Sequence, residues 1–375
     1  MLFKEIIGVD KTKSAILNAV KSNHFAHASL IRGISGSANL SFALAIAQYL
    51  QCENPLENDS CGTCFSCNQH AKLQHPDCHY YFPLTTLEKV GKDDVKSYLV
   101  PFFRTFAINR PFDSINDWGN HIGTENKQFN IPVEEARSIL KNATMSSFQG
   151  GAKIILVWLP EYLHNSASNA ILKVLEEPPA NTYFLLVTCN MESLLTTIIS
   201  RCQTIQIERF TNEEIQNYLK NKLNIESTIA FETSLLAEGS IGNALKLINE
   251  GYDAVFEPFT QFMRLCFGFK VPDILVFNDE LSKKGREFQK SFLTYGINII
   301  RNVMLIHSGN GAIVKLNGNQ LDFVKKFSES ININQIDKFN LILQDGIIHV
   351  ERNGNSKVIF LDIAIQLHKL FRGTR

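Results

Sequence analysis

The sequence predicts an α/β domain followed by two helical domains, and three observations lead to this fold class. The chain has 375 residues, 45% of them hydrophobic and 20% charged, which is enough for two or three domains with full cores. In the first two thirds, short runs of β-branched and aromatic residues alternate with helical patterns, as in βαβ units. Beyond Phe210 the strand signals fade and helical periodicity dominates.

Four short apolar runs predict strands of a parallel sheet. They are Ser29–Arg32, Lys153–Trp158, Tyr183–Thr188 and Thr204–Ile207. Such nearly continuous apolar runs suit strands that are buried on both faces. The clearest helix between them spans Asn165–Glu176, with Asn165 as its predicted N-cap and two prolines behind it as the stop signal.

The pattern divides the chain into three domains. We expect an α/β domain at residues 1–208, a small helical domain at 209–270 and a helical C-terminal domain at 271–375, whose apolar residues repeat every three or four positions from Phe288 to Ile306. Residues 84–130 have poor periodicity and look like an insertion in the α/β domain. An unstructured loop of that length is unusual, so we expect it to have structure of its own.

Charge and composition exclude several classes of protein. The 37 basic and 37 acidic residues balance, which excludes the strongly basic footprint of proteins that hold nucleic acid mainly by counterion release. The N-terminal residues lack the unbroken apolar region of a signal peptide, and no run approaches the roughly 20 apolar residues that cross a bilayer. We therefore expect a cytoplasmic protein without membrane contact, whose eight cysteines are not paired as disulfides.

Four of the cysteines form a C-x8-C-x2-C-x2-C cluster. They are Cys52, Cys61, Cys64 and Cys67. Cys-x-x-Cys spacing lets two thiolates reach one tetrahedral ion from a tight turn, and two further thiolates close the shell. Such a site leaves no position open for water, so the pattern favours a structural zinc module at residues 52–67. The alternatives are a redox dithiol and unrelated buried thiols.

A strand, a glycine loop and a helix follow one another in the order typical of a phosphate-binding loop. Compared with G-x-x-x-x-G-K-[ST], Gly33 matches the first glycine and Ala38 replaces the second. Asn39 replaces the lysine, and Leu40 replaces the hydroxyl that binds magnesium. With Gly33 and Gly36 as the remaining glycines, the loop has no anchor for the β- and γ-phosphates. The simpler interpretation is a plain turn between strand and helix.

The acidic pair that accompanies such a loop is also missing. A nucleotide hydrolase of this class ends a later apolar strand with Asp-Glu, which holds Mg²⁺ and polarises water. Here the apolar strand runs into Trp158 and Leu159. We therefore expect no ATP in this chain's own site.

Together these motifs resemble bacterial clamp-loader AAA+ subunits, because their order is the same. The order is His27-Ala28, the degenerate glycine loop, the four cysteines, His75-Pro76-Asp77, Asn169 to Pro179, and Ser200-Arg201-Cys202. The loop and the acidic pair are degenerate while Ser-Arg-Cys is kept, so the chain is similar to the delta-prime subunits of DNA polymerase III. The resemblance is strong over residues 1–208 outside the insertion and moderate to about 270.

The resemblance implies roles for individual residues. The four cysteines would bind zinc. Arg201 would enter the ATP site of the neighbouring subunit as an arginine finger, with Ser200 and Cys202 positioning the turn. Without the resemblance, Arg201 reads as a paired surface arginine. Gly242 stands where active relatives place an arginine that senses nucleotide.

The implied architecture is an α/β P-loop (AAA+) domain with an inserted zinc module, a helical lid and an all-α oligomerisation collar. The implied function is that of a catalytically inactive subunit that braces an ATPase complex while it loads a sliding clamp onto primed DNA. Its partners would be the gamma/tau and delta subunits, the clamp and the DNA. One rival is an active clamp-loader ATPase, which Asn39 and Leu40 argue against. The other is a zinc-ribbon DNA-binding protein, which the neutral charge argues against.

Overall fold

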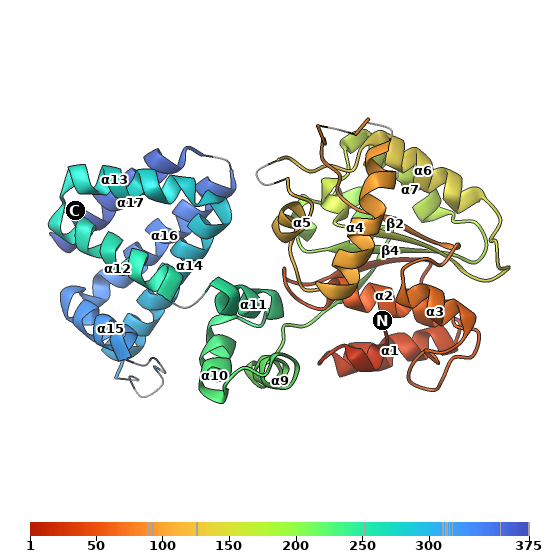
Figure 1. Cartoon of the computed structure of the whole chain (residues 1–375), viewed down its shortest axis with the longest axis horizontal. Helices are drawn as coiled ribbons and strands as arrows, with labels where there is room; N and C mark the ends of the chain where they lie inside the picture. Colours follow the sequence, from red (N-terminus) through yellow and green to blue (C-terminus); the bar gives the residue numbers. More distant parts are fainter. Residues whose placement is uncertain are drawn as a thin grey trace. The chain divides into compact units, whose positions relative to one another are not determined.

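The chain forms two compact units, Met1–Leu245 and Lys246–Arg375, shown in Figure 1. The structure is a computed structural model, and it describes residues 1–88, 90–91, 94–124, 127–250, 253–309, 311, 314, 316, 318–352 and 354–373. Within these ranges, no helix is both long and apolar enough to span a bilayer. Each unit has a hydrophobic core of its own.

The first unit is built on a five-stranded sheet in which all neighbouring strands are parallel. The strands, in spatial order, are β2 (Cys78–Tyr81), β3 (Lys153–Trp158), β4 (Thr182–Thr188), β1 (Ala28–Arg32) and β5 (Gln203–Gln206). Along β1, Leu30 lies beside Leu186 of β4 and Thr204 of β5. The predicted α/β fold class with a parallel sheet is therefore confirmed.

The parallel arrangement gives the sheet two distinct edges. Segments that follow the strands gather where the strands end, which we call the carboxyl edge. Segments that lead into the strands gather at the opposite end, which we call the amino edge. This separation decides which side chains of the first unit can meet.

Helices cover both faces of the sheet. On one face, α6 (Val133–Thr144), α7 (Asn165–Glu176) and α8 (Thr196–Ile199) share a core with alternate residues of β1, β3 and β4. On the other face, α2 (Asn39–Leu50) packs on the same three strands, and all but the last of its residues are buried. Two further helices, α1 (Asp10–Lys21) and α3 (Phe65–Ala71), flank α2 along the chain.

The chain between β2 and β3 contains a helical insertion. It includes α4 (Val95–Asn109) and α5 (Ile115–His121). Leu84 and Asn130 form an antiparallel bridge at its base, with backbone hydrogen bonds of 2.8 and 2.9 Å. The described residues between Leu84 and Asn130 therefore leave the sheet and return to it at this bridge.

Aromatic packing joins this insertion to the sheet. The rings of Phe103 and Phe106 lie 5.9 and 5.3 Å from the ring of Trp118, and both also contact Trp158 at the end of β3. The indole N–H of Trp118 donates to the carbonyl oxygen of Pro83 at 3.1 Å. Because these three insertion side chains are buried, the insertion is part of the core of the first unit.

Helices alone follow the sheet in the described part of the chain. α9 (Asn212–Leu223), α10 (Ser227–Leu236) and α11 (Ile241–Glu250) come first, and α11 crosses from the first unit into the second. The second unit contains α12 (Asp253–Gly268), α13 (Val271–Lys283), α14 (Gly285–His307), α15 (Gly318–Ser330), α16 (Ile336–Glu351) and α17 (Ser356–Phe371). Its core is rich in buried phenylalanine, including Phe259, Phe262, Phe292, Phe339 and Phe360.

Two local features differ from the sequence-based expectation. β2 was not predicted, because its four residues include His79 and two tyrosines rather than an apolar run. Helix α7 has the predicted bounds, but its N-cap is His164, whose Nδ1 accepts from the backbone N–H of Ser166 at 3.3 Å. Asn165 is instead the first helical residue.

Candidate functional site

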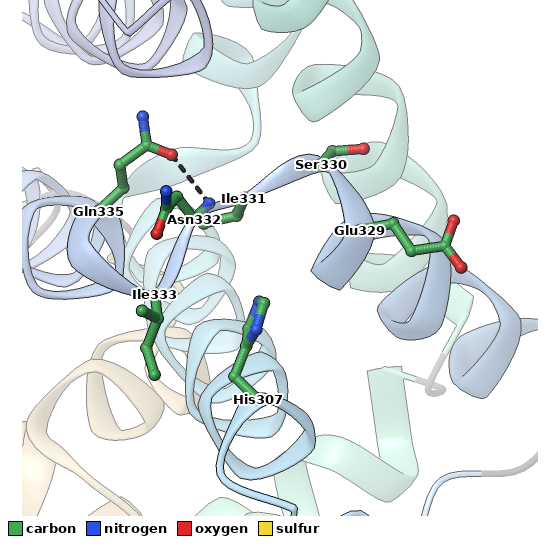
Figure 2. A pocket seen from close by; sticks show the side chains of 7 residues that line it. All are labelled: His307, Glu329, Ser330, Ile331, Asn332, Ile333 and Gln335. Atoms are coloured by element: carbon green, nitrogen blue, oxygen red, sulfur yellow. Dashed lines mark hydrogen bonds between the residues drawn. The ribbon is translucent and has the colours of Figure 1, made fainter.

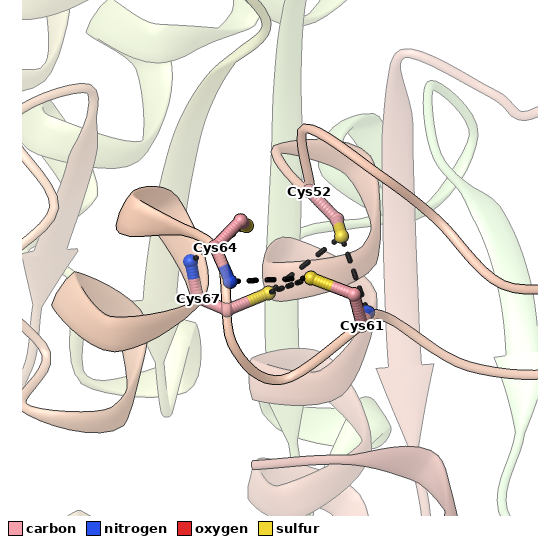
Figure 3. A group of neighbouring side chains, drawn as sticks. All are labelled: Cys52, Cys61, Cys64 and Cys67. Atoms are coloured by element: carbon pink, nitrogen blue, oxygen red, sulfur yellow. Dashed lines mark hydrogen bonds between the residues drawn. The ribbon is translucent and has the colours of Figure 1, made fainter.

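Four cysteine side chains converge between the end of α2 and the first turn of α3 (Figure 3). All four Sγ atoms lie within 4.8 Å of one another. The Sγ of Cys67 is 3.8 Å from that of Cys61 and 3.6 Å from that of Cys52. A tetrahedral zinc ion with Zn–S bonds of about 2.3 Å places its sulfurs roughly 3.8 Å apart, so this donor set is compatible with structural zinc.

Backbone N–H groups point at the sulfur atoms. Cys61 donates to the Sγ of Cys52 at 3.3 Å, Cys64 to that of Cys61 at 3.3 Å, and Cys67 to that of Cys64 at 3.4 Å. Backbone hydrogen bonds from Thr63 and Cys64 lower the pKa of Cys61 to about 6, whereas burial raises the pKa of Cys52 and of Cys67. Burial thus opposes the charging of two thiols, and a bound dication would offset that cost.

Asp59 ties the cysteine loop to the start of the chain. Its carboxylate accepts from the backbone N–H groups of Phe3 and Lys4, each at 3.0 Å, and from that of Ser60 at 2.8 Å. Gln48 of α2 donates to the hydroxyl of Ser60 at 3.1 Å. The loop that carries the cysteines is therefore anchored to the core through polar contacts as well as through its ends.

A stacked pair of histidines follows the cysteine loop along the chain. The rings of His70 and His75 are 4.9 Å apart, and both side chains are buried. His70 Nε2 is 2.7 Å from Oε1 of Gln51, and His75 Nδ1 accepts from the backbone N–H of Asp77 at 3.2 Å. Burial lowers the pKa of both histidines, that of His70 to about 3, so both rings are neutral near pH 7.

The glycine loop lies at the carboxyl edge, where β1 leads into α2. Asn39, in the place of a phosphate-binding lysine, is buried, and its Nδ2 donates to the carbonyl of Thr188 at 3.3 Å. Its Oδ1 accepts from the hydroxyl of Ser37 at 2.6 Å. Leu40, in the place of the magnesium ligand, is also buried. The loop therefore contains a neutral amide whose polar atoms are bonded within the protein.

A second contact covers the loop from the side of α11. Gly242 donates its backbone N–H to the carbonyl of Gly36 at 3.0 Å, and the hydroxyl of Ser240 donates to the carbonyl of Ser35 at 2.9 Å. A methyl group on Gly242 would lie 2.4 Å from the carbonyl oxygen of Phe112, a buried residue of the insertion. The glycine loop, the insertion and the start of α11 thus meet at one point.

The end of β3 presents no carboxylate. Trp158 and Leu159, which occupy the positions of the acidic pair, are both buried. The next acidic residue is Glu161, whose Oε1 accepts from the backbone N–H groups of Cys189 at 3.2 Å and Asn190 at 3.3 Å. Burial raises the pKa of Glu161. Its carboxylate therefore fixes the segment after β4.

Arg201 precedes β5 and lies at the surface. Its Nε donates to Oε1 of Glu176 at 2.6 Å, and the Nη2 group pairs with the same oxygen. Its Nη1 donates to the carbonyl of Thr197 at 2.9 Å, which also accepts from the hydroxyl of Ser200 at 3.2 Å. Burial raises the pKa of Cys202 to about 12, so this thiol is neutral and packs against the core. The contacts of Ser200, Arg201 and Cys202 therefore stabilise the turn between α8 and β5.

Arg201 and the glycine loop occupy opposite edges of the sheet. Arg201 leads into β5 and is at the amino edge, whereas Gly33 follows β1 and is at the carboxyl edge. β1 has five residues, so the two edges are roughly 13 Å apart at about 3.3 Å per residue. The structure brings the four cysteines together but separates Arg201 from Gly33, Gly36, Asn39 and Leu40.

Comparison with known proteins identifies the family. Residues 8–211 match the family described as DNA polymerase III, delta subunit, and this is more than half of the chain. The chain belongs to this family. The resemblance to clamp-loader subunits that the motif order predicted is confirmed.

The curated relatives of this family member are DNA polymerase III subunits. The delta′ subunit of Haemophilus influenzae is 31% identical over 227 residues, 60% of this chain and 56% of the relative. The delta′ subunit of Escherichia coli is 28% identical over 221 residues, 59% of this chain and 54% of the relative. The tau subunit of Salmonella typhimurium is 26% identical over 254 residues, 66% of this chain and 33% of the relative. The match spans between about a third and just over half of these relatives.

A hollow of about 570 Å³ lies in the second unit of this family member, remote in sequence from every residue predicted to act (Figure 2). It is lined by His307, Glu329, Ser330, Ile331, Asn332, Ile333 and Gln335. Its amide groups are used locally: Gln335 Oε1 accepts from the backbone N–H of Asn332 at 2.9 Å, and its Nε2 donates to the carbonyl of Leu370 at 2.6 Å. The hollow is therefore interpreted as a gap between the end of α15 and the start of α16, and not as a ligand site.

Sequence reasoning missed two residues of these sites. Glu176 was noted only as part of a motif, although it binds Arg201, 25 positions away. Phe112 falls in the stretch that the sequence marks only as an insertion, although its carbonyl lies against Gly242. Neither pairing leaves a local signal, because the partners are adjacent only after the sheet has formed.

Proposed function

We propose that this clamp-loader subunit does not hydrolyse ATP and instead donates Arg201 to the ATP site of a neighbouring subunit. The carrying observation is the separation of Arg201 from the chain's own glycine loop by the length of a strand. An arginine at the amino edge cannot reach phosphates bound at the carboxyl edge of the same sheet. It lies at the surface, with 28% of its side chain exposed, where a second subunit can approach it.

The chain's own loop supports an inactive site. Asn39 carries no charge for the phosphates, and its amide is already bonded to Thr188 and Ser37. Gly242 occupies the place of the nucleotide-sensing arginine and is in backbone contact with Gly36. Mg·ATP would therefore lack the lysine that pairs with its phosphates and the hydroxyl that binds its metal.

The four cysteines would hold one structural zinc ion. Their thiolates supply a closed tetrahedral shell, and the backbone N–H groups that bond to sulfur would stabilise its charge. The ion would fix the loop between α2 and α3 and leave no position for catalysis.

Within the assembly, the subunit would brace the complex and assist ATP-dependent loading of the sliding clamp onto primed DNA. The partners that the family likeness suggests are the ATPase gamma/tau subunits, the delta subunit, the clamp and the primed DNA. The rival function as an active ATPase shares the fold but needs the lysine and the acidic pair. The rival as a zinc-ribbon DNA-binding protein needs a basic surface, which a balanced charge of 37 and 37 does not favour.

The test uses clamp loaders reconstituted with variants of this chain. Arg201→Ala should lower DNA- and clamp-stimulated ATP turnover and clamp loading while assembly and zinc content stay unchanged. Arginine fingers in other systems raise the rate of phosphoryl transfer roughly a thousandfold or more at their own site. The effect on total turnover should be smaller, because the other sites of the complex still hydrolyse ATP. Arg201→Lys should rescue poorly, because an ammonium lacks the planar fork of donors.

Arg209→Ala is the matched control, since Arg209 is also exposed and donates to a single backbone carbonyl, that of Glu238. It should leave stimulated turnover unchanged. Wild-type rates for Arg201→Ala in a correctly assembled complex would show that Arg201 is an ordinary surface arginine.

A further inference from the structure

The contact with Glu176 determines which side of the Arg201 guanidinium is already bonded within the chain. Nε and Nη2 both face Oε1 of Glu176, and Nη1 faces the carbonyl of Thr197. A guanidinium has five N–H donors, one on Nε and two on each terminal nitrogen. These contacts use one N–H of each nitrogen, so each terminal nitrogen keeps one more donor for another acceptor.

Glu176 is itself held in place. It is the last residue of α7, and the backbone N–H of Glu177 closes the final turn on the carbonyl of Lys173 at 3.0 Å. His27 Nε2 is 2.9 Å from the carbonyl of Leu175, so an N–H on this ring nitrogen donates to the helix end. The carboxylate therefore projects from a fixed point at the amino edge.

A carboxylate at this end of a helix is electrostatically unfavourable. The C-terminus of a helix carries partial negative charge, which favours a cation rather than an anion there. The positive charge of Arg201 offsets this repulsion. Both side chains are partly exposed, 28% for Arg201 and 48% for Glu176, so the pair contributes little to the stability of the fold.

We propose that Glu176 is a positioning residue for Arg201. It holds the Nε edge of the guanidinium so that the free donors of Nη1 and Nη2 are presented to the γ-phosphate of the neighbouring subunit. A long arginine side chain that is already ordered loses less conformational entropy when it meets the phosphate. This inference rests on the proposed trans role of Arg201 and adds the residue that orients it.

The main test measures stimulated ATP turnover of the reconstituted clamp loader with Glu176→Ala, Glu176→Gln and Glu177→Gln. Glu176→Ala should lower kcat several-fold and leave KM for ATP unchanged, because the nucleotide is bound by the neighbour and only the finger is disordered. Glu176→Gln should restore most of the rate, since its amide oxygen still accepts from Nε. Glu177 is a neighbouring exposed acid, so Glu177→Gln should keep the turnover rate of the wild type.

A second measurement examines the contact without any turnover. In the isolated full chain labelled with ¹⁵N-arginine, the Nε–H signal of Arg201, assigned by its loss in Arg201→Lys, should exchange slowly with water. In Glu176→Ala it should exchange fast or disappear.

The outcomes separate the two proposals. Suppose that Arg201→Ala slows turnover, while Glu176→Ala leaves it unchanged or speeds it. Glu176 then does not position the finger. Equal losses in Glu176→Ala and Glu177→Gln would also overturn the inference, because the effect would then be one of surface charge. If Arg201→Ala itself keeps the wild-type rate, the proposed function fails instead.

Discussion

Gly242 donates its backbone N–H to the carbonyl oxygen of Gly36 at 3.0 Å, which fixes the glycine loop to the start of α11. A Cβ atom on Gly242 would lie 2.7 Å from the Cα of Gly36 and 2.4 Å from the carbonyl oxygen of Phe112. Gly36 has φ of +78°, a conformation that glycine adopts without strain. A Cβ atom on Gly36 would lie 2.2 Å from Oγ of Ser240 and 2.9 Å from the Cα of Gly242. The contact requires a glycine on both sides because backbone atoms, which cannot rotate away, lie within this range of each Cβ position.

Gly242→Ala should therefore destabilise the first unit. Overpacking against rigid neighbours costs about 1–3 kcal/mol, which outweighs the higher helix propensity of alanine. The measurement is urea denaturation followed by circular dichroism. Gly151→Ala is the control, because a methyl group there meets no described atom within 4 Å. Equal denaturation midpoints for the two variants would contradict the close approach.

Anaerobically purified protein should contain about one tightly held zinc ion per chain. Structural zinc in small peptides is worth on the order of 10–16 kcal/mol, so Cys64→Ser should release the metal and destabilise residues 52–67 even if the larger unit survives. Elemental analysis and limited proteolysis measure both effects. Cys189→Ser, which changes an exposed cysteine outside the cluster, should keep its zinc. Zinc-free wild-type protein would remove this prediction.

The isolated chain should neither hydrolyse ATP nor bind Mg·ATP tightly. The buried amide of Asn39 replaces the lysine, and Leu40 replaces the metal ligand. Asn39→Lys alone should not restore binding, because it places an ammonium in a buried site while the acidic pair is still absent. Titration calorimetry measures this, and low-micromolar affinity of the wild-type chain would show that the loop still works.

Stability should fall as the pH drops below about 6.5, the ordinary pKa of histidine. Burial lowers the pKa of His70 to about 3, so the unfolded chain takes up a proton that the folded chain does not. The free energy of unfolding should decrease by up to about 1.4 kcal/mol per pH unit for this residue. His75, whose pKa is also lowered by burial, adds to the slope in the same direction.

Urea denaturation of zinc-saturated protein between about pH 7.5 and pH 5.5 measures this slope. His70→Gln should flatten it. His24→Gln, at an exposed position, should not. A slope that is the same in His70→Gln as in the wild type would mean that His70 is not the group responsible.

The sequence by itself determined the features that depend on short-range patterns. Apolar runs such as Ile154–Val157 can be read as buried strands, because β-branched residues pack well on a pleated surface. The bounds of α7 followed from periodicity and the prolines behind it. The four cysteines could be grouped because sixteen residues of chain hold them together. In each case the residues that interact are close along the chain.

Only the tertiary structure decided the relationships between residues that are distant in sequence. β2 has no apolar run of its own and becomes a strand by pairing with β3. The base of the insertion is set by the bridge between Leu84 and Asn130, and its Phe112 reaches Gly242. The contact of Arg201 with Glu176, and its distance from the glycine loop, follow from the parallel order of the sheet. The direction of the strands assigns each loop to an edge, and no local pattern encodes which loops will share one.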